Sequence, residues 1–384
     1  MQNFSFHNPV KILFGEGQIA KIAREIPAEA RILVTYGGGS IKANGVYDQV
    51  MQALSGRDVR EFGGIEANPR YETLMRAVDL AREEKVDFLL AVGGGSVLDG
   101  TKFIAAAVPF TGELWAILAD RAPVNEAVPL GAVLTLPATG SEMNAFSVVS
   151  REATQEKLGF FSPLVYPRFS VLDPTTTYSL PPRQIGNGVV DAFVHTVEQY
   201  LTYPAGAPLQ DRFAEGVLLT LIEEGPKTLA EPRNYEARAN VMWCATMALN
   251  GMIGVGVPQD WATHGIGHEL TALFGLDHAQ TLAVVLPSLL TVQKAGKLDK
   301  LVQYAERVWD IRQGTPEQKA ELAIVSTRAF FEAMGVKTRL SEYGVAADQL
   351  GAIPERLAAR GPIALGEHGD IDGEKVKAIL AGAL

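Results

Sequence analysis

Three short apolar segments in the first half of the chain each end in a glycine-rich turn. They cover residues 31–36, 86–92 and 131–136, and the turns read Gly-Gly-Gly-Ser, Gly-Gly-Gly-Ser and Pro-Ala-Thr-Gly-Ser. Apolar runs of this length predict strands that are buried on both faces. Between the first two, apolar residues recur at helical spacing over residues 71–84. Strands that alternate with helices predict a parallel sheet with flanking helices, so we expect an α/β fold here.

The glycine-rich turns predict a ligand that carries phosphate. Consecutive glycines let backbone N–H groups converge on an anion, and a helix that begins there adds the positive end of its dipole. One such turn can serve backbone geometry alone, but three at the strand ends of one sheet predict a nucleotide site. A separate match to the dinucleotide fingerprint over residues 15–20 is interpreted as a structural turn, because no carboxylate closes the next strand.

The missing carboxylate also bears on which dinucleotide binds. Enzymes selective for NAD commonly place Asp or Glu where it binds the ribose 2′-hydroxyl, and that charge repels the extra phosphate of NADP. The corresponding stretch here is Gly37-Gly38-Gly39-Ser40, followed by Lys42. Because this stretch tolerates a 2′-phosphate, the sequence favours NADP as the cofactor.

The chain changes character after residue 178. Strand patterns fade, and long helical patterns continue to the C-terminus, for example over residues 207–229, 235–252 and 315–334. A chain of 384 residues exceeds what one hydrophobic core usually supports. We therefore predict two domains, an α/β dinucleotide-binding domain over residues 1–178 and an all-helical domain over residues 179–384.

Four of the six histidines lie in one stretch of the helical half, which opens with Asp191. Asp191 and His195 are spaced i, i+4, as are His264 and His268, so on a helix each pair projects from one face. Imidazole and carboxylate are ligands for divalent cations such as zinc or ferrous iron, and a chain with one cysteine excludes sulfur ligation. A lone histidine is more often a core or surface residue, but these residues together with His278 predict a metal site.

Two glycines lie between the paired histidines of that stretch. Gly265 and Gly267 each weaken a helix by about 1 kcal/mol relative to alanine. A close backbone approach, to the other domain or to the substrate, would explain this cost.

Composition excludes several classes of partner. The formal net charge is −10, and no basic stripe interrupts the acidic residues. This balance argues against nucleic acid or an anionic membrane as a partner. No apolar run reaches the roughly 18 residues of a membrane span, and the first residues lack a secretory pattern. We expect a cytoplasmic protein that acts on small molecules.

Several motifs together resemble one enzyme family. They are the ten residues from Gly93 to Lys102, the six from Pro137 to Glu142, the Asp191 and His195 pair, and the series His264, His268 and His278. The chain resembles the iron-containing alcohol dehydrogenases over essentially its whole length. It is most similar to their bacterial branch of NADP-dependent aldehyde reductases and butanol dehydrogenases. It departs from that pattern at residues 135–141, where Thr-Leu-Pro-Ala-Thr-Gly-Ser replaces the more usual Thr-Thr-Ala-Gly-Thr-Gly-Ser.

The resemblance implies a homodimeric oxidoreductase that interconverts aldehydes and primary alcohols with NADP(H), with one Fe²⁺ or Zn²⁺ as Lewis acid. The implied metal ligands are Asp191, His195, His264 and His278. His268 would lie beside the metal and position the substrate or transfer a proton. The implied cofactor contacts are Gly37, Gly38, Gly39, Ser40, Gly94, Gly95, Ser96, Asp99, Thr135, Thr139 and Lys157.

Two other functions fit parts of the pattern. Sugar-phosphate cyclases such as dehydroquinate synthase combine a nucleotide domain with a helical metal domain and recycle NAD without net redox change. They need several basic side chains for a phosphorylated substrate, and the histidine-rich stretch offers few. A non-catalytic module that binds metal or nucleotide would not need three phosphate-type turns.

Overall fold

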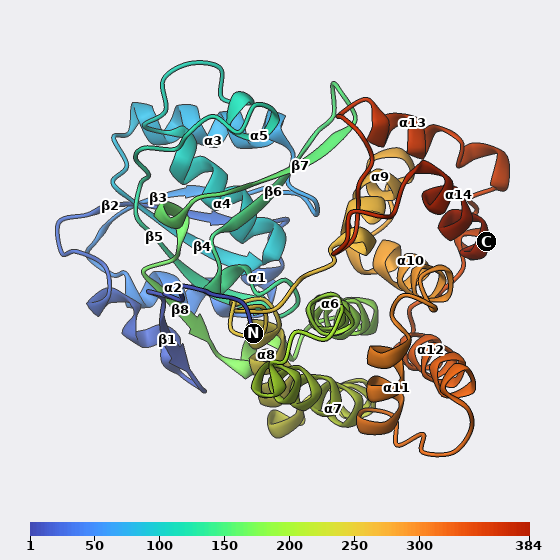
Figure 1. Ribbon diagram of the computed structural model, residues 1–384. Helices are drawn as coiled ribbons and strands as arrows, with labels where there is room; N and C mark the ends of the chain where they lie inside the picture. Colours follow the sequence, from blue (N-terminus) through green and yellow to red (C-terminus); the bar gives the residue numbers. More distant parts are fainter. The chain divides into compact units, whose positions relative to one another are not determined.

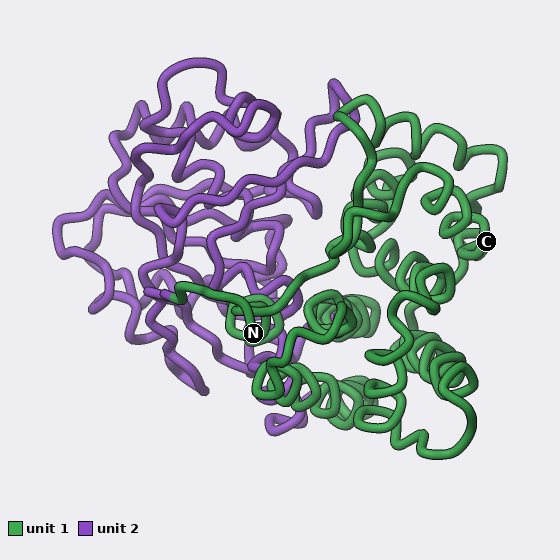
Figure 2. The backbone as a smooth tube through the Cα atoms, in the orientation of Figure 1, with its two compact units in different colours: residues 1–6, 181–232, 247–384 green, residues 7–180, 233–246 purple.

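A computed structural model describes residues 1–384, which form two compact units (Figures 1 and 2). The sheet unit comprises residues 7–180 and 233–246. The helical unit comprises residues 1–6, 181–232 and 247–384. The sheet unit therefore takes one segment from the second half of the chain.

A six-stranded parallel sheet forms the centre of the sheet unit, with the strand order β1-β8-β5-β4-β2-β3. These strands are β1 (Lys11–Phe14), β2 (Arg31–Tyr36), β3 (Asp58–Phe62), β4 (Phe88–Gly94), β5 (Leu130–Leu136) and β8 (Phe169–Leu172). Strands β6 (Phe146–Arg151) and β7 (Glu156–Phe161) form a separate antiparallel hairpin. The three strands predicted from apolar runs are confirmed as β2, β4 and β5.

Alternating side chains of the central strands fill two cores, one on each face of the sheet. On β2, Leu33 packs into one core, while Ile32 and Val34 pack into the other. This two-sided burial explains the continuous apolar runs, because successive side chains of a strand point to opposite faces. The first core is covered by α3 (Tyr71–Glu83) and α4 (Gly95–Ala107). The second is covered by the 3-10 helix η1 (Gln18–Arg24) and α2 (Val46–Ala53).

The strand order places the predicted phosphate turns at one edge of the sheet. Strands β2 and β4 are neighbours. The chain continues from β2 to β3 on one side of this pair and from β4 to β5 on the other side. Ligands of open α/β sheets bind at the carboxyl ends of strands, at such a reversal of order. The remaining helices of this unit are α1 (Ser40–Ala43), α5 (Ala116–Ala119) and most of α8 (Tyr235–Ala248).

The helical unit is built around one buried helix. Helix α6 (Pro182–Tyr200) is buried at every position from Ile185 to Tyr200 except Asn187. A helix that is buried all round lies in the core of its unit rather than on its surface. Its other helices are α7 (Pro208–Ala230), α9 (Ala262–Phe274), α10 (His278–Val292), α11 (Leu298–Arg307), α12 (Pro316–Ala333), α13 (Ala352–Ala358) and α14 (Gly373–Gly382). The helical character predicted for the second half is confirmed, and none of these helices is long and apolar enough to span a membrane.

Candidate functional site

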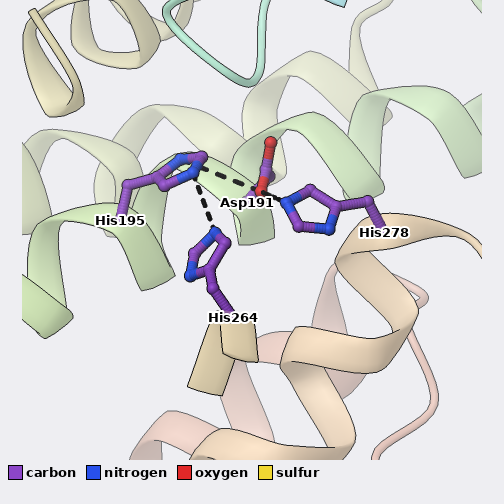
Figure 3. A group of neighbouring side chains, drawn as sticks. All are labelled: Asp191, His195, His264 and His278. Atoms are coloured by element: carbon purple, nitrogen blue, oxygen red, sulfur yellow. Dashed lines mark hydrogen bonds and ion pairs between the residues drawn. The ribbon is translucent and has the colours of Figure 1, made fainter. Parts of the chain in front are cut away.

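Three helices of the helical unit bring four candidate ligands together. Asp191 and His195 lie one turn apart on α6, His264 lies in the first turn of α9, and His278 is the first residue of α10. One ligand atom from each of these residues lies within 4.8 Å of the others. Figure 3 shows the three rings and the carboxylate converging from separate helices. A group of one carboxylate and three imidazoles suits one divalent cation.

The starts of α9 and α10 fix two of these side chains. At the start of α10, the Asp277 N–H donates to Gln280 Oε1 at 2.9 Å. At the start of α9, the Ala262 N–H donates to Asp260 Oδ1 at 2.9 Å. Both histidines therefore come from a first helical turn in which a side-chain oxygen holds a backbone N–H.

Two distances within the group are close to those around a small tetrahedral ion. The Nε2 atoms of His195 and His264 lie 3.0 Å apart, and His278 Nε2 lies 3.5 Å from Asp191 Oδ1. Two ligands about 2.1 Å from a tetrahedral ion lie about 3.4 Å from one another. Burial, followed by the charge of His264, lowers the pKa of His195 well below its usual value. The neutral His195 ring therefore offers a lone pair, and the donor set fits a divalent metal.

His268 lies beside the group but does not belong to it. It is one turn beyond His264 on α9, with its ring centre 6.3 Å from that of His264 and 5.8 Å from that of His278. Its side chain is half-buried. This position suits contact with a substrate at the metal rather than ligation.

The glycines of α9 allow a close approach within the helical unit. A Cβ atom at Gly267 would lie 2.7 Å from the Thr281 Oγ1 atom of α10. A Cβ atom at Gly265 would meet the Leu365 side chain at 3.5 Å, an ordinary contact. A tight approach therefore occurs at Gly267, but its partner is α10, the helix that carries His278, and not the other domain or the substrate as expected from the sequence.

The predicted cofactor residues gather around the carboxyl ends of β2, β4 and β5. Gly37 to Ser40 follow β2, Gly94 ends β4, and Gly95 and Ser96 begin α4. No side chain caps the first turn of α4, so its N–H groups remain available to an anion. Gly95 also lies against Thr139, because a Cβ atom there would collide with the threonine side chain.

Other predicted contacts lie in internal networks of the sheet unit. The Asp99 carboxylate accepts from Ser141 Oγ at 2.6 Å and from the Val148 N–H at 2.9 Å. Lys102 is fully buried, and it donates to Ser141 Oγ and to two further oxygens. Asp99 and Lys102 are therefore not a solvated ion pair. Asp99 instead holds the segment after β5 in place.

Ser96 and Lys157 share a partner that the sequence analysis missed. Lys157 on β7 donates to Asn68 Oδ1 at 2.9 Å, and the Asn68 N–H donates to Ser96 Oγ at 3.2 Å. Asn68 has a left-handed backbone with φ 54°. Its position in Ala-Asn-Pro, a turn-forming sequence before α3, was the only available signal.

Glu198 was also missed. It lies one turn beyond His195 on α6, and its carboxylate contacts the His264 ring and backbone. The spacing of Asp191, His195 and Glu198 is i, i+4, i+7, which places all three on one face of a helix. That spacing could have identified it.

Comparison with known proteins assigns the family. Residues 9–174 match the iron-containing alcohol dehydrogenases, and residues 186–384 match the C-terminal part of the Fe-containing alcohol dehydrogenase family. The chain belongs to the iron-containing alcohol dehydrogenase family. Its sequence resemblance to that family is thereby confirmed.

Two relatives of this alcohol dehydrogenase cover nearly all of its length. The NADPH-dependent aldehyde reductase YqhD of Escherichia coli is 61% identical over 374 residues, which are 97% of each chain. A crystal structure of YqhD gives a TM-score of 0.99 at 59% identity and covers 100% of this chain and 99% of that one. An NADH-dependent butanol dehydrogenase A from Thermotoga maritima gives a TM-score of 0.95 at 36% identity, with 100% and 99% covered.

Proposed function

We propose that this protein is a metal-dependent, NADP(H)-linked oxidoreductase that reduces aldehydes to primary alcohols and catalyses the reverse reaction. The observation that carries the proposal is the convergence of Asp191, His195, His264 and His278 within 4.8 Å. The relative at 61% identity is an NADPH-dependent aldehyde reductase, which supports both the cofactor and the substrate class.

Each part of the chain has a distinct role in this proposal. Residues 1–178 act as the dinucleotide-binding domain, and residues 179–384 act as the metal-binding catalytic domain. When bound, the divalent ion polarises the substrate oxygen as a Lewis acid, and NADPH supplies the hydride. The four ligand side chains hold the ion, and His268 positions the substrate or transfers a proton at its oxygen.

The sheet unit orients the cofactor. The turn from Gly37 to Ser40 accommodates the 2′-phosphate, because it carries no acidic side chain. The uncapped start of α4 binds phosphate through backbone N–H groups. Asp99, Thr135, Thr139 and Lys157 complete the cofactor site. The single cysteine and acidic composition support a reducing cytoplasmic location, and the family supports a homodimer.

A stoichiometric assay separates this function from its rivals. Purified protein, zinc or ferrous salt, NADPH and butanal are mixed, and absorbance at the nicotinamide band is followed. We expect one NADPH oxidised for each butanal reduced, and slower oxidation when NADH replaces NADPH. A cyclase would recycle its NAD, and a non-catalytic module would leave NADPH unchanged, so an absorbance that does not fall would contradict the proposal.

A further inference from the structure

The Glu198 carboxylate binds both the backbone and the imidazole ring of one candidate metal ligand, His264. Glu198 Oε1 accepts from the Thr263 N–H at 2.8 Å and from the His264 N–H at 3.4 Å. Glu198 Oε2 pairs with His264 Nδ1. The Glu198 side chain is buried, so water does not compete for these bonds. A single carboxylate therefore fixes both the start of α9 and the orientation of the imidazole.

The pairing with Nδ1 decides which atom of His264 faces the other ligands. An ionised carboxylate only accepts hydrogen bonds, so opposite an ionised Glu198 the proton of a neutral His264 lies on Nδ1. The lone pair then lies on Nε2, which is the atom 3.0 Å from His195 Nε2. Carboxylates that bind the outer nitrogen of a ligating histidine fix its tautomer and raise its basicity.

Charges around Glu198 favour a cation nearby. The Glu198 carbonyl accepts from the Asp260 N–H at 2.9 Å. Lys297 pairs with Asp260 at 2.9 Å and with Glu367 at 2.6 Å, and all three side chains are buried. Asp260 and Glu367 thus share one buried ammonium, and Glu198 is a third buried carboxylate beside them. Buried charge of one sign is costly unless it is paired, and a divalent ion next to His264 would offset this excess.

We propose that Glu198 is a positioning residue for the metal, which holds His264 with Nε2 directed at the ion. Tight metal binding then depends on the Glu198 carboxylate. This inference rests on the metal site proposed above. The alternative is that Glu198 only caps α9, since its bonds to two backbone N–H groups are those of a helix cap.

The Glu198→Gln variant separates the two roles. The amide oxygen of glutamine can still accept from the N–H groups of Thr263 and His264. Its NH₂ group donates and does not accept, so it would favour the His264 tautomer with the proton on Nε2. The cap therefore survives the substitution, while the lone pair toward the metal is lost.

Glu269→Gln is the matched control. Glu269 lies on the same helix α9, is 1% exposed, and pairs with Arg356 at 2.6 Å and Arg360 at 2.7 Å. These two ion pairs do not involve any of the four candidate ligands. The control loses a buried carboxylate of α9 without altering the His264 tautomer.

The test measures zinc affinity of the metal-free full-length proteins by competition with a chromophoric chelator. We expect Glu198→Gln to bind zinc about 10- to 100-fold more weakly than the wild type. Glu269→Gln should stay within about twofold, and Glu198→Asp should recover part of the affinity because it restores a carboxylate. Equal zinc affinity of Glu198→Gln and wild type, or an equal loss in Glu269→Gln, would overturn the inference.

A second measurement uses only the wild-type protein, so its result does not depend on whether a variant folds. In wild-type protein with ¹⁵N-labelled histidine, two-bond ¹H–¹⁵N spectra report which ring nitrogen carries the proton. We expect zinc-loaded His264 to carry it on Nδ1, whereas a proton on Nε2 would overturn the inference. A wild type that binds no zinc would instead contradict the metal site itself, so the two failures are distinguishable.

Discussion

The Nε2 atom of His195 lies 3.0 Å from the Nε2 atom of His264, and the rings are stacked with their centres 4.7 Å apart. At this distance either one ring donates its Nε2–H to the other, or both lone pairs face a shared cation. Burial lowers the pKa of His195, so its ring is neutral and can serve as a ligand. With Asp191 and His278, this pair forms the proposed metal site.

His268→Ala should slow turnover while the metal stays bound. If His268 transfers a proton at the substrate oxygen, its loss should lower kcat by about 100-fold or more. Elemental analysis and steady-state kinetics of the same preparation check this. His368→Ala is the control, because His368 stacks on Tyr203 instead. Loss of metal from His268→Ala would make this residue a ligand.

Gly38→Asp should weaken NADPH binding far more than NADH binding. The site tolerates a side chain, since nothing lies within 4 Å of a Cβ atom built there. The new charge would repel the 2′-phosphate, and at about 4 Å this repulsion costs at least about 1 kcal/mol, or fivefold or more in affinity. Fluorescence titration with both cofactors checks this, with Gly38→Asn as the uncharged control. An unchanged preference in Gly38→Asp would contradict the assignment of the 2′-phosphate to this turn.

Gly267→Ala should destabilise the helical unit, although alanine is the better helix former. The new Cβ atom would lie 2.7 Å from Thr281 Oγ1, so either Thr281 must give up its hydrogen bond to the His278 carbonyl or α9 and α10 must move apart. We expect a loss of about 1–3 kcal/mol in the free energy of unfolding, and weaker zinc binding because these helices carry His264 and His278. Gly265→Ala, whose Cβ atom meets only Leu365 at 3.5 Å, is the control. Equal stability of the two variants would refute the steric argument.

Lys102 should make the sheet unit more stable as the pH rises above 8. Burial lowers the pKa of Lys102 from 10.5 to about 8. Between these values the unfolded chain binds more protons than the folded chain, so the contribution of Lys102 to the free energy of unfolding increases with pH. The increase is at most about 1.4 kcal/mol per pH unit. Denaturant unfolding of wild type and Lys102→Met from pH 7 to 10 measures it. A pH-independent difference between the two proteins would contradict the shifted pKa.

The sheet and the ligand stretch could be predicted from local sequence. Apolar runs closed by glycine-rich turns identify β2, β4 and β5, because strands buried on both faces leave a strong local signal. The i, i+4 pairs placed Asp191 and His195 on one face of α6. His278 was expected in the same cluster because four of the six histidines lie in one stretch, and the family resemblance implied it as a ligand.

Contacts between distant segments could not be predicted in this way. Glu198 meets His264 across 66 positions, and Lys157 meets Asn68 across 89. Asp99 and Lys102 have the spacing of a surface ion pair, and only the packing of α4 shows that they hold an internal segment instead. Periodicity reports which face of an element is buried, but it does not identify the partner on the other side.

Asp191→Ala and His278→Ala should each strip the metal and abolish turnover. Each variant removes one of the four proposed ligands, and the sheet unit, to which we assign cofactor binding, does not contain either residue. NADPH affinity should therefore stay close to that of the wild type. Elemental analysis and cofactor titration check both expectations. A variant that keeps its metal and its rate would show that the ligand is assigned wrongly.

Anomalous diffraction at the zinc edge, from crystals grown with zinc, tests the metal centre most directly. We expect one strong peak in each chain, about 2.0–2.2 Å from a side-chain atom of Asp191, His195, His264 and His278. Crystals that lack this peak, or that place zinc elsewhere while these four side chains lie apart, would contradict the account.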